Sequence, residues 1–337
     1  MVQQRRIITM EDRPPLPDFN VSGHGGPGGP PNGGIPTDED QTILLALRGI
    51  SAIISFFGLV ANGIVLWFLC FRIPRNQFTV YILNLALADF TVLFCSLPTL
   101  LFVFGHPMKL EASSTAMNVL LALRVFILFG YNTSLYLLTA ISVERCLSVF
   151  QPIWYKCRRP HHQSVIVCVL TWALSCLLTG PEFFTCDKDM YTSHNKKCAA
   201  ALISSFGFGF VIFAPVMVIS SISLICKVHR SSQQRQPLKL YLVIVITVLV
   251  FLISTVPPRL LDLLLYFKAL PRGAIPFFVA HHVSMICSTI NSSLNPFIYV
   301  FVGGLWKQRG QGPIQEALSS VFKSEMEPTD LEEEASN

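Results

Sequence analysis

Glu144 and Arg145 lie side by side near the end of a long apolar stretch, "LLTAISVERCLSVF". Removing a carboxylate or a guanidinium from water is costly, so ionisable groups in or beside a membrane segment are candidates for function. A guanidinium at such a place can serve as a movable contact for a partner outside the membrane. The alternative is that both side chains are interfacial and extend toward lipid headgroups.

A second set of polar residues lies inside other apolar stretches. Asp89 stands near the middle of "LNLALADFTVL". A buried carboxylate requires a cation or hydrogen-bond donors, and oxygen ligands suit a hard cation such as sodium. The alternative is a hydrogen-bonded network that packs without an ion. The other oxygen-bearing residues at depths where they can converge are Asn62, Ser134, Asn291 and Asn295.

Composition indicates that membrane helices position these residues. Of 337 residues, 52% are hydrophobic and 13% charged, whereas soluble domains average about 25% charged residues. A helix needs about 20 apolar residues to cross a bilayer, where its backbone must satisfy its own hydrogen bonds. The apolar runs cover 43–71, 78–104, 116–149, 163–181, 200–227, 238–267 and 276–302. The predicted fold is an all-α membrane protein, a seven-transmembrane helix bundle over residues 43–302.

The loops and tails predict the orientation of the bundle. Lys and Arg are more frequent in the loops on the side of the C-terminus, which places that side in the cytoplasm of a multi-pass plasma-membrane protein. Residues 1–42, rich in Pro and Gly, are predicted to be a disordered extracellular tail, with a glycosylation acceptor at Asn20. Residues 303–323 predict a short amphipathic eighth helix, before an acidic tail over 324–337.

Several classes of protein are disfavoured. A net charge of +5 does not indicate nucleic-acid binding, and ten cysteines without CxxC spacing do not indicate zinc. The motifs HExxH and GxSxG and a phosphate-binding glycine loop are absent from the sequence, so an enzyme is not expected. A transporter or channel is the alternative from another class. Transporters usually carry internal repeats, and the two halves of this chain are not duplicated.

Short motifs follow one another in a characteristic order. They are Asn62-Gly63, "LALAD" at 85–89, "ERC" at 144–146, Trp172, Pro215 and "NPFIY" at 295–299. This set resembles the rhodopsin-like G-protein-coupled receptors over about residues 43–322. The stretches "FGYNTSLYLLTAISVERCLSVFQPIWYKCRRP" and "NSSLNPFIYVFVG" look more specifically like those of the Mas-related receptors.

The resemblance implies roles for both sets of polar residues. Arg145 would be held by Glu144 in the inactive state and released toward a heterotrimeric G protein, with Gq or Gi favoured. Tyr299, in the motif with Asn295 and Pro296, would swing inward to support the open state. Asp89, Ser134, Asn291 and Asn295 match the sodium pocket of the family position by position. Arrestin, receptor kinases and membrane lipids are the further partners implied.

The sequence also departs from the wider family. The start of the third apolar run has no cysteine, and Mas-related receptors instead bridge the fourth helix to the fifth, which implies a Cys186–Cys198 disulfide. The alternative is two free thiols. Thr255 stands where the family usually has a Trp, so Phe251, one turn deeper, would take part of that role. The inner end of the sixth run has no carboxylate to restrain Arg145, which predicts elevated ligand-free signalling.

Matching positions also bear on the ligand. Ile127 stands where amine receptors have an Asp, and Thr289 stands where visual pigments have a Lys, so both ligand classes are disfavoured. In Mas-related receptors an acid at the position of Glu182 contacts cationic ligands, although a second family acid is replaced by Leu202. A mixed-charge pocket suits a short peptide. The candidate ligand-binding residues are Glu182, Arg124, Tyr131, Arg259 and Asp262, of which the last two could instead neutralise each other at helical spacing.

Overall fold

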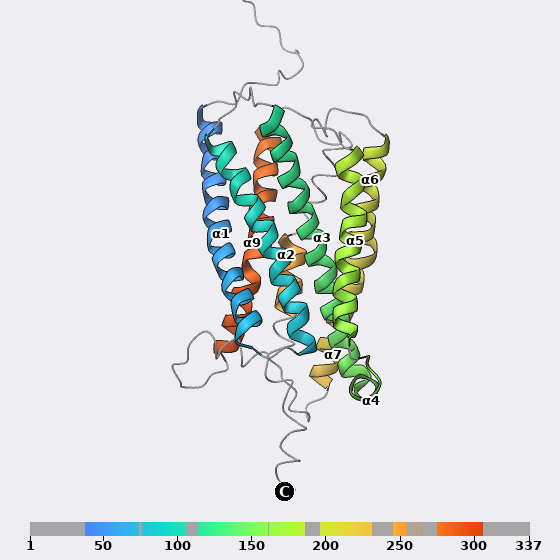
Figure 1. The fold of residues 1–337 in the computed structure, drawn as a ribbon. Helices are drawn as coiled ribbons and strands as arrows, with labels where there is room; N and C mark the ends of the chain where they lie inside the picture. Colours follow the sequence, from blue (N-terminus) through green and yellow to red (C-terminus); the bar gives the residue numbers. More distant parts are fainter. Residues whose placement is uncertain are drawn as a thin grey trace, which may run out of the picture.

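Helices make up every regular element in the part of the chain that the computed structural model describes (Figure 1). The described residues are 38–73, 76–105, 114–160, 162–185, 196–230, 245–254, 260, 264 and 275–305. The elements are α1 (Asp38–Phe71), α2 (Gln77–Gly105), α3 (Ser114–Phe150), α4 (Pro152–Cys157), α5 (Gln163–Thr185), α6 (Lys196–Gly207), η1 (Phe208–Phe213), α7 (Ala214–Arg230) and α9 (Ile275–Leu305). Residues 245–254 form a further helical stretch.

These helices agree with the predicted apolar runs. Within the described residues, five helical spans are long and apolar enough to cross a membrane, and Val245–Ser254 is a shorter apolar helix inside the predicted sixth run. α1 begins before residue 43 and α9 continues past residue 302. Hydropathy marks only the part of a helix that meets lipid, and the backbone ladder continues beyond it. Asn20, Cys186, Arg259, Asp262 and the residues beyond Leu305 lie outside the described residues.

The distribution of side chains is that of a membrane bundle. Large apolar side chains face outward, with Phe184 83% and Leu177 70% exposed. Polar side chains are gathered inside, where Asn62 and Asp89 have no exposed surface. Since lipid covers the outer surface, the polar groups must find their partners within the bundle.

Two glycines allow helices to approach closely. A Cβ at Gly58 of α1 would collide with Ser293 Oγ of α9 and lie 2.9 Å from Leu93 Cδ1 of α2. A Cβ at Gly130 of α3 would lie 2.9 Å from the carbonyl oxygen of Ala88 on α2. Small residues at such contacts are the usual means by which membrane helices pack without a hydrophobic driving force. These contacts bring together the four helices that carry the buried polar residues.

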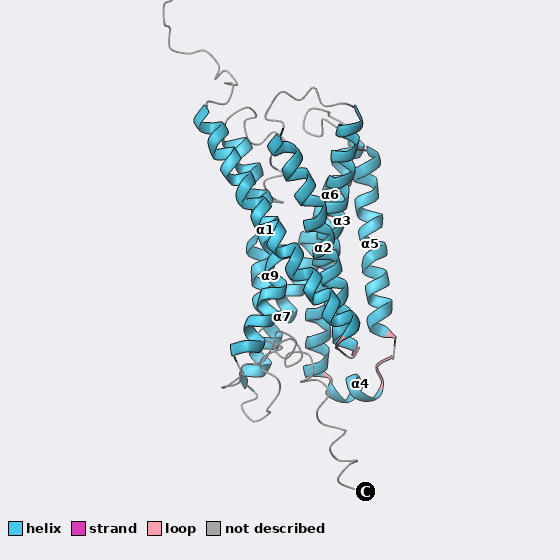
Figure 2. Cartoon of the chain, turned by 60° about the vertical axis from the view of Figure 1, so that its left-hand side comes forward, coloured by secondary structure: helices cyan, strands magenta, loops and turns pink. Residues whose placement is uncertain are grey.

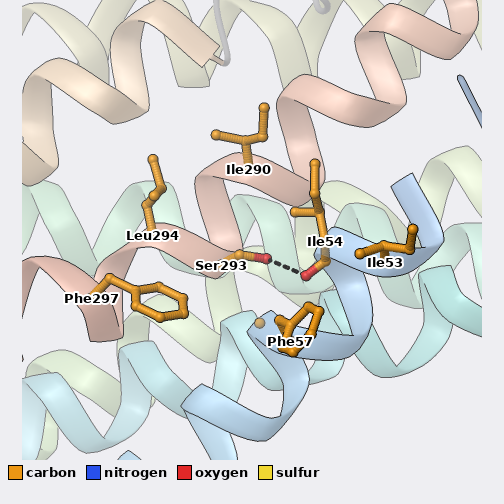
Figure 3. A pocket seen from close by; sticks show the side chains of 8 residues that line it. Ile53, Ile54, Phe57, Ile290, Ser293, Leu294 and Phe297 are labelled. Carbon is orange, nitrogen blue, oxygen red and sulfur yellow. Dashed lines mark hydrogen bonds between the residues drawn. The ribbon is translucent and has the colours of Figure 1, made fainter. Parts of the chain in front are cut away.

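An apolar groove runs between α1 and α9 on the outside of the bundle (Figure 3). Its volume is about 270 Å³. Its hydroxyl group, on Ser293, donates to the backbone carbonyl of Ile54 at 3.2 Å. Phe57 and Phe297 at its edges are 61% and 50% exposed, so the groove faces lipid. Its lining residues are Ile53, Ile54, Phe57, Gly58, Ile290, Ser293, Leu294 and Phe297.

The fifth predicted span is interrupted by the π-helical turn η1, directly before Ala214 and Pro215. Proline lacks the N–H that would continue the helical ladder, and π turns often accommodate such a break. α3 packs against this turn: Thr139 Oγ1 lies 3.4 Å from the Phe213 carbonyl oxygen, and the Tyr136 and Phe213 ring centroids are 4.3 Å apart. The sequence predicted the span and its proline but not the change of helix type.

Candidate functional site

The end of α3 carries Glu144 and Arg145 inside the bundle rather than at its surface. They are only 4% and 3% exposed. α4, in the loop that joins α3 to α5, lies at this end of the bundle (Figures 1 and 2). We refer to the connection between Phe150 and Gln163 as the α4 loop, and to this end of the bundle as the α4 end. Burial at these levels argues against both side chains simply extending to headgroups.

Glu144 is bound by three donors, and all of them meet the same oxygen. Its Oε1 accepts from Arg159 Nη2 at 2.8 Å, from Gln163 Nε2 at 3.1 Å and from the Tyr81 hydroxyl at 3.3 Å. Among the described residues, Oε2 has no hydrogen-bond partner. The acid is therefore anchored toward α2, α5 and the α4 loop.

Arg145 is held by different groups. Its Nη2 donates to the Tyr155 hydroxyl at 3.0 Å, and its guanidinium lies 4.8 Å from the centre of the Phe78 ring. The resemblance implied that Glu144 restrains Arg145, but the ion pair of Glu144 in this structure is formed with Arg159. The α4 loop brings Arg159 Nη2 to 2.8 Å from Glu144 Oε1, so the charged partner of the acid comes from the loop.

The α4 loop supplies contacts that were not predicted from the sequence. Pro152 stands in the first turn of α4, where its missing N–H costs nothing. Tyr155 then lies against Arg145, while Ile153 is 78% exposed. Burial raises the pKa of the Tyr155 hydroxyl above its ordinary value, so it stays protonated at neutral pH. The density of aromatic and basic residues in "PIWYKCRRP" was the signal that could have found this loop.

The predicted cluster around Asp89 is largely assembled. Ser134 Oγ of α3 donates to Asp89 Oδ1 at 2.9 Å, and Asn295 Nδ2 of α9 donates to Oδ2 at 2.6 Å. Asn62 of α1 donates to the carbonyl oxygens of Gly58 and Ser292 at 2.9 and 3.0 Å. Four helices thus converge on one polar core, as the sequence predicted.

The donor set of this core fits a hard monovalent cation. Asn295 Oδ1 is buried and has no hydrogen-bond partner within the described part of the chain, and such an orphaned acceptor requires an explanation. It lies on the side chain that already contacts the Asp89 carboxylate. Asn291 is also buried, although no described bond joins it to Asp89. Among the described residues, no group of three or more His, Cys, Asp and Glu could hold a transition metal.

The opposite end of the bundle holds the described candidates for ligand contact. Glu182 of α5 is buried, one turn beyond Thr179, whose hydroxyl accepts from Asn132 Nδ2 of α3 at 3.1 Å. Tyr131, next to Asn132, is also buried. Arg124 is half-buried on the same helix, two turns nearer that end. The structure therefore places Glu182 and Tyr131 at similar depth on adjoining helices.

Tyr131 also contacts the sixth span. Its ring centroid is 6.0 Å from that of Phe251, which has no exposed surface. Phe251 was predicted to take part of the role of the Trp that Thr255 replaces. Phe251 therefore directly contacts Tyr131, one of the candidate ligand-binding residues.

The cysteines divide into two kinds. Cys198 is buried at the start of α6 and is disulfide-bonded. The other cysteines of the described residues are free thiols: Cys70, Cys95, Cys146, Cys157, Cys168, Cys176, Cys226 and Cys287. Cys186 lies outside the described residues, so its pairing with Cys198 remains a prediction.

Comparison with known proteins agrees with this arrangement. The profile of the family described as "7 transmembrane receptor (rhodopsin family)" matches residues 61–299. The chain belongs to this family. It is therefore a multi-pass membrane receptor that couples to heterotrimeric G proteins. Proteins of this family are receptors rather than enzymes, and membership also rules against the alternative of a transporter or channel.

Within that family the chain is similar to the Mas group. It is 47% identical to Proto-oncogene Mas of Homo sapiens over 276 residues, which are 82% of each chain. It is 42% identical to Mas-related G-protein coupled receptor member H of Rattus norvegicus, over 81% of this chain and 82% of that protein. With member D of Homo sapiens the identity is 38%, over 78% and 80% of the two chains. The predicted kinship with Mas-related receptors is confirmed.

Proposed function

We propose that this receptor binds a short extracellular peptide at the end of the bundle opposite α4, and that it activates Gq or Gi at the α4 end. In the plasma membrane, the α4 end then faces the cytoplasm, and the N-terminus, with Asn20 glycosylated, lies outside the cell. The observation that supports the peptide most directly is the buried carboxylate of Glu182. A charge that is removed from water on a lipid-embedded helix is a functional candidate by default.

The charges around Glu182 favour a peptide over a lipid or a simple amine. Arg124 and Tyr131 on α3 add a cation and a hydroxyl, and Arg259 with Asp262 would add one charge of each sign. A peptide can satisfy several separated charges at once, whereas an amine satisfies one. A Cys186–Cys198 bridge would tie the chain after α5 to α6 beside this region, and the disulfide state of Cys198 supports it.

The aromatic contact between Tyr131 and Phe251 supports a route to the other end of the bundle. A ligand that moves Tyr131 must also move the Phe251 ring that packs against it, and Phe251 belongs to the sixth span. Closely packed side chains switch between discrete arrangements rather than deforming smoothly. The ligand would bias such a switch toward the open form.

Opening must expose Arg145, which a cytosolic partner cannot reach at 3% exposure. We assign Arg145 to the G-protein contact, and Tyr299, with Asn295 and Pro296, to support of the open state. The exposed Ile153 on α4, the helix that also carries Tyr155, offers the G protein an apolar contact. Arrestin and receptor kinases would use the same cytoplasmic surface and the adjoining tail.

Sodium would stabilise the closed form. Asp89, Ser134, Asn291 and Asn295 would hold the ion, which supplies the positive charge that a buried carboxylate lacks. Without it, Asp89, Ser134 and Asn295 form the hydrogen-bonded network described above. The ion therefore acts as an allosteric ligand and not as a cofactor.

A peptide screen tests the proposed ligand class. Cells that express the receptor are exposed to a library of short cationic and mixed-charge peptides, with intracellular calcium reporting Gq and cAMP reporting Gi. Hits are then compared on Glu182→Gln and on Glu182→Asp, which keeps the charge. We expect Glu182→Gln to lower the potency of cationic peptides about tenfold or more, because the positive group of the peptide loses the buried carboxylate that pairs with it. Equal potency on all three receptors would remove Glu182 from the ligand site.

A further inference from the structure

The α4 loop binds the acid that lies next to Arg145 in the sequence. The Arg159–Glu144 ion pair is shielded from water, since the two side chains are only 2% and 5% exposed. Arg159 Nη2 also donates to Ser164 Oγ at 2.9 Å, and the guanidinium lies 4.7 Å from the centre of the Tyr155 ring. Buried ion pairs persist when further hydrogen bonds fix their geometry, as these do.

Glu144 still has capacity for another donor. A carboxylate offers about four acceptor positions, and here the three donors all meet Oε1. Oε2 is buried without a hydrogen-bond partner in the described part of the chain. The guanidinium of Arg145 lies 5.9 Å from the centre of the Tyr155 ring, and that of Arg159 lies 4.7 Å from the same ring, so the two cations lie on one aromatic side chain next to the acid. Arg159 draws the carboxylate of Glu144 toward the α4 loop and away from Arg145.

We infer that Arg159 competes with Arg145 for Glu144, and thereby sets how firmly Arg145 is held in the ligand-free receptor. The inference rests on the proposed role of Arg145 in contacting the G protein. Arg159 is a positioning residue, since it acts on Arg145 only through Glu144. While Arg159 holds the acid, Arg145 lies against the hydroxyl of Tyr155 and the ring of Phe78, which are neutral.

Two substitutions should then shift ligand-free activity in opposite directions. Arg159→Gln frees the acid to bind Arg145, which adds a charge-assisted hydrogen bond to the closed form and lowers activity. Tyr155→Phe removes a hydrogen bond that holds Arg145 and raises activity. A loss of structure would move both variants in the same direction, so the opposition separates positioning from simple destabilisation.

The experiment measures GTPγS uptake by a purified heterotrimeric G protein on the full-length receptor in lipid nanodiscs, without any ligand. Relative to wild type, we expect Arg159→Gln to lower the rate about fivefold and Tyr155→Phe to raise it about threefold, as the usual strengths of charged and neutral hydrogen bonds suggest. Arg158→Gln removes the same charge from an exposed neighbouring position and should leave the rate unchanged. In a Glu144→Gln background, Arg159→Gln should have no further effect.

A rate that rises or stays constant in Arg159→Gln, or a fall that persists in the Glu144→Gln background, overturns the inference. If Arg159→Gln cannot be purified, Arg159→Lys replaces it, because lysine keeps the charge and loses the planar fork. A smaller fall is then expected, and no fall counts against competition. Arg145→Ala distinguishes failure of the proposed function from failure of the inference about Arg159. Exchange that survives in Arg145→Ala refutes the role of Arg145 itself, independently of Arg159.

Discussion

At the scale of single residues, the two acids singled out in this receptor are held inside the bundle by hydrogen bonds. Glu144 and Asp89 are both buried, and each accepts hydrogen bonds from more than one helix or loop. The two acids differ in what surrounds them. Glu144 has a guanidinium partner in Arg159, whereas the described partners of Asp89 are neutral. Asp89 is consequently the acid that a free cation would stabilise.

Sodium dependence is the test of that difference. Replacing sodium by N-methyl-D-glucamine at constant ionic strength should raise ligand-free G-protein exchange on the wild-type receptor. Asp89→Asn should abolish the difference between the two cations, because the amide has the same shape and no charge. Thr91→Val on the same helix is the control, since Thr91 bonds only its own backbone at Leu87 in the described structure. An unchanged sodium response in Asp89→Asn would refute the site.

At the scale of helices, close packing depends on residues without side chains. Gly58 lets α1 meet α2 and α9 at the level of the polar core, and Asn62 follows one turn later on the same helix. The groove of Figure 3 lies on the lipid side of this contact. A change at Gly58 should therefore act on the bundle as a whole rather than on one bond.

Gly58→Ala should destabilise the receptor by about 1–3 kcal/mol, the usual cost of overpacking, because the new methyl group collides with Ser293 and Leu93. Gly49→Ala is a matched control on α1, since its Cβ would meet nothing within 4 Å. Thermal inactivation of the purified proteins in the same detergent compares the two. Equal inactivation temperatures for both variants would contradict the packing described for α1.

Helix positions were predictable from sequence because lipid imposes a simple rule on apolar length. The convergence of Asp89, Ser134 and Asn295 was also predictable, since their depth in the runs and a known motif order coincide. The partner of Glu144 was not, because Arg159 lies outside the apolar runs and contacts the acid only when the α4 loop folds back. The π turn at Phe208–Phe213 was not predicted either, because Pro215 marks a break in the helical ladder without specifying the type of helix that precedes it.

At the scale of the whole molecule, the bundle separates two regions. The end opposite α4 holds Glu182 and Tyr131, and the α4 end holds Arg145, which is hydrogen-bonded to Tyr155. Between them lie the Tyr131–Phe251 contact and the polar core around Asp89. Under the proposed roles of the two ends, ligand binding at one and G-protein binding at the other would favour the same open form, and the coupling between them would be reciprocal.

The most direct test of this account concerns Arg145. GTPγS exchange on a purified G protein is measured with full-length receptor in nanodiscs, comparing wild type, Arg145→Ala and the neighbouring control Arg158→Gln. The account predicts that Arg145→Ala lowers exchange to the rate of the G protein alone, while the melting behaviour of the receptor shows that it is folded and Arg158→Gln matches wild type. Exchange at the wild-type rate in folded Arg145→Ala would contradict it.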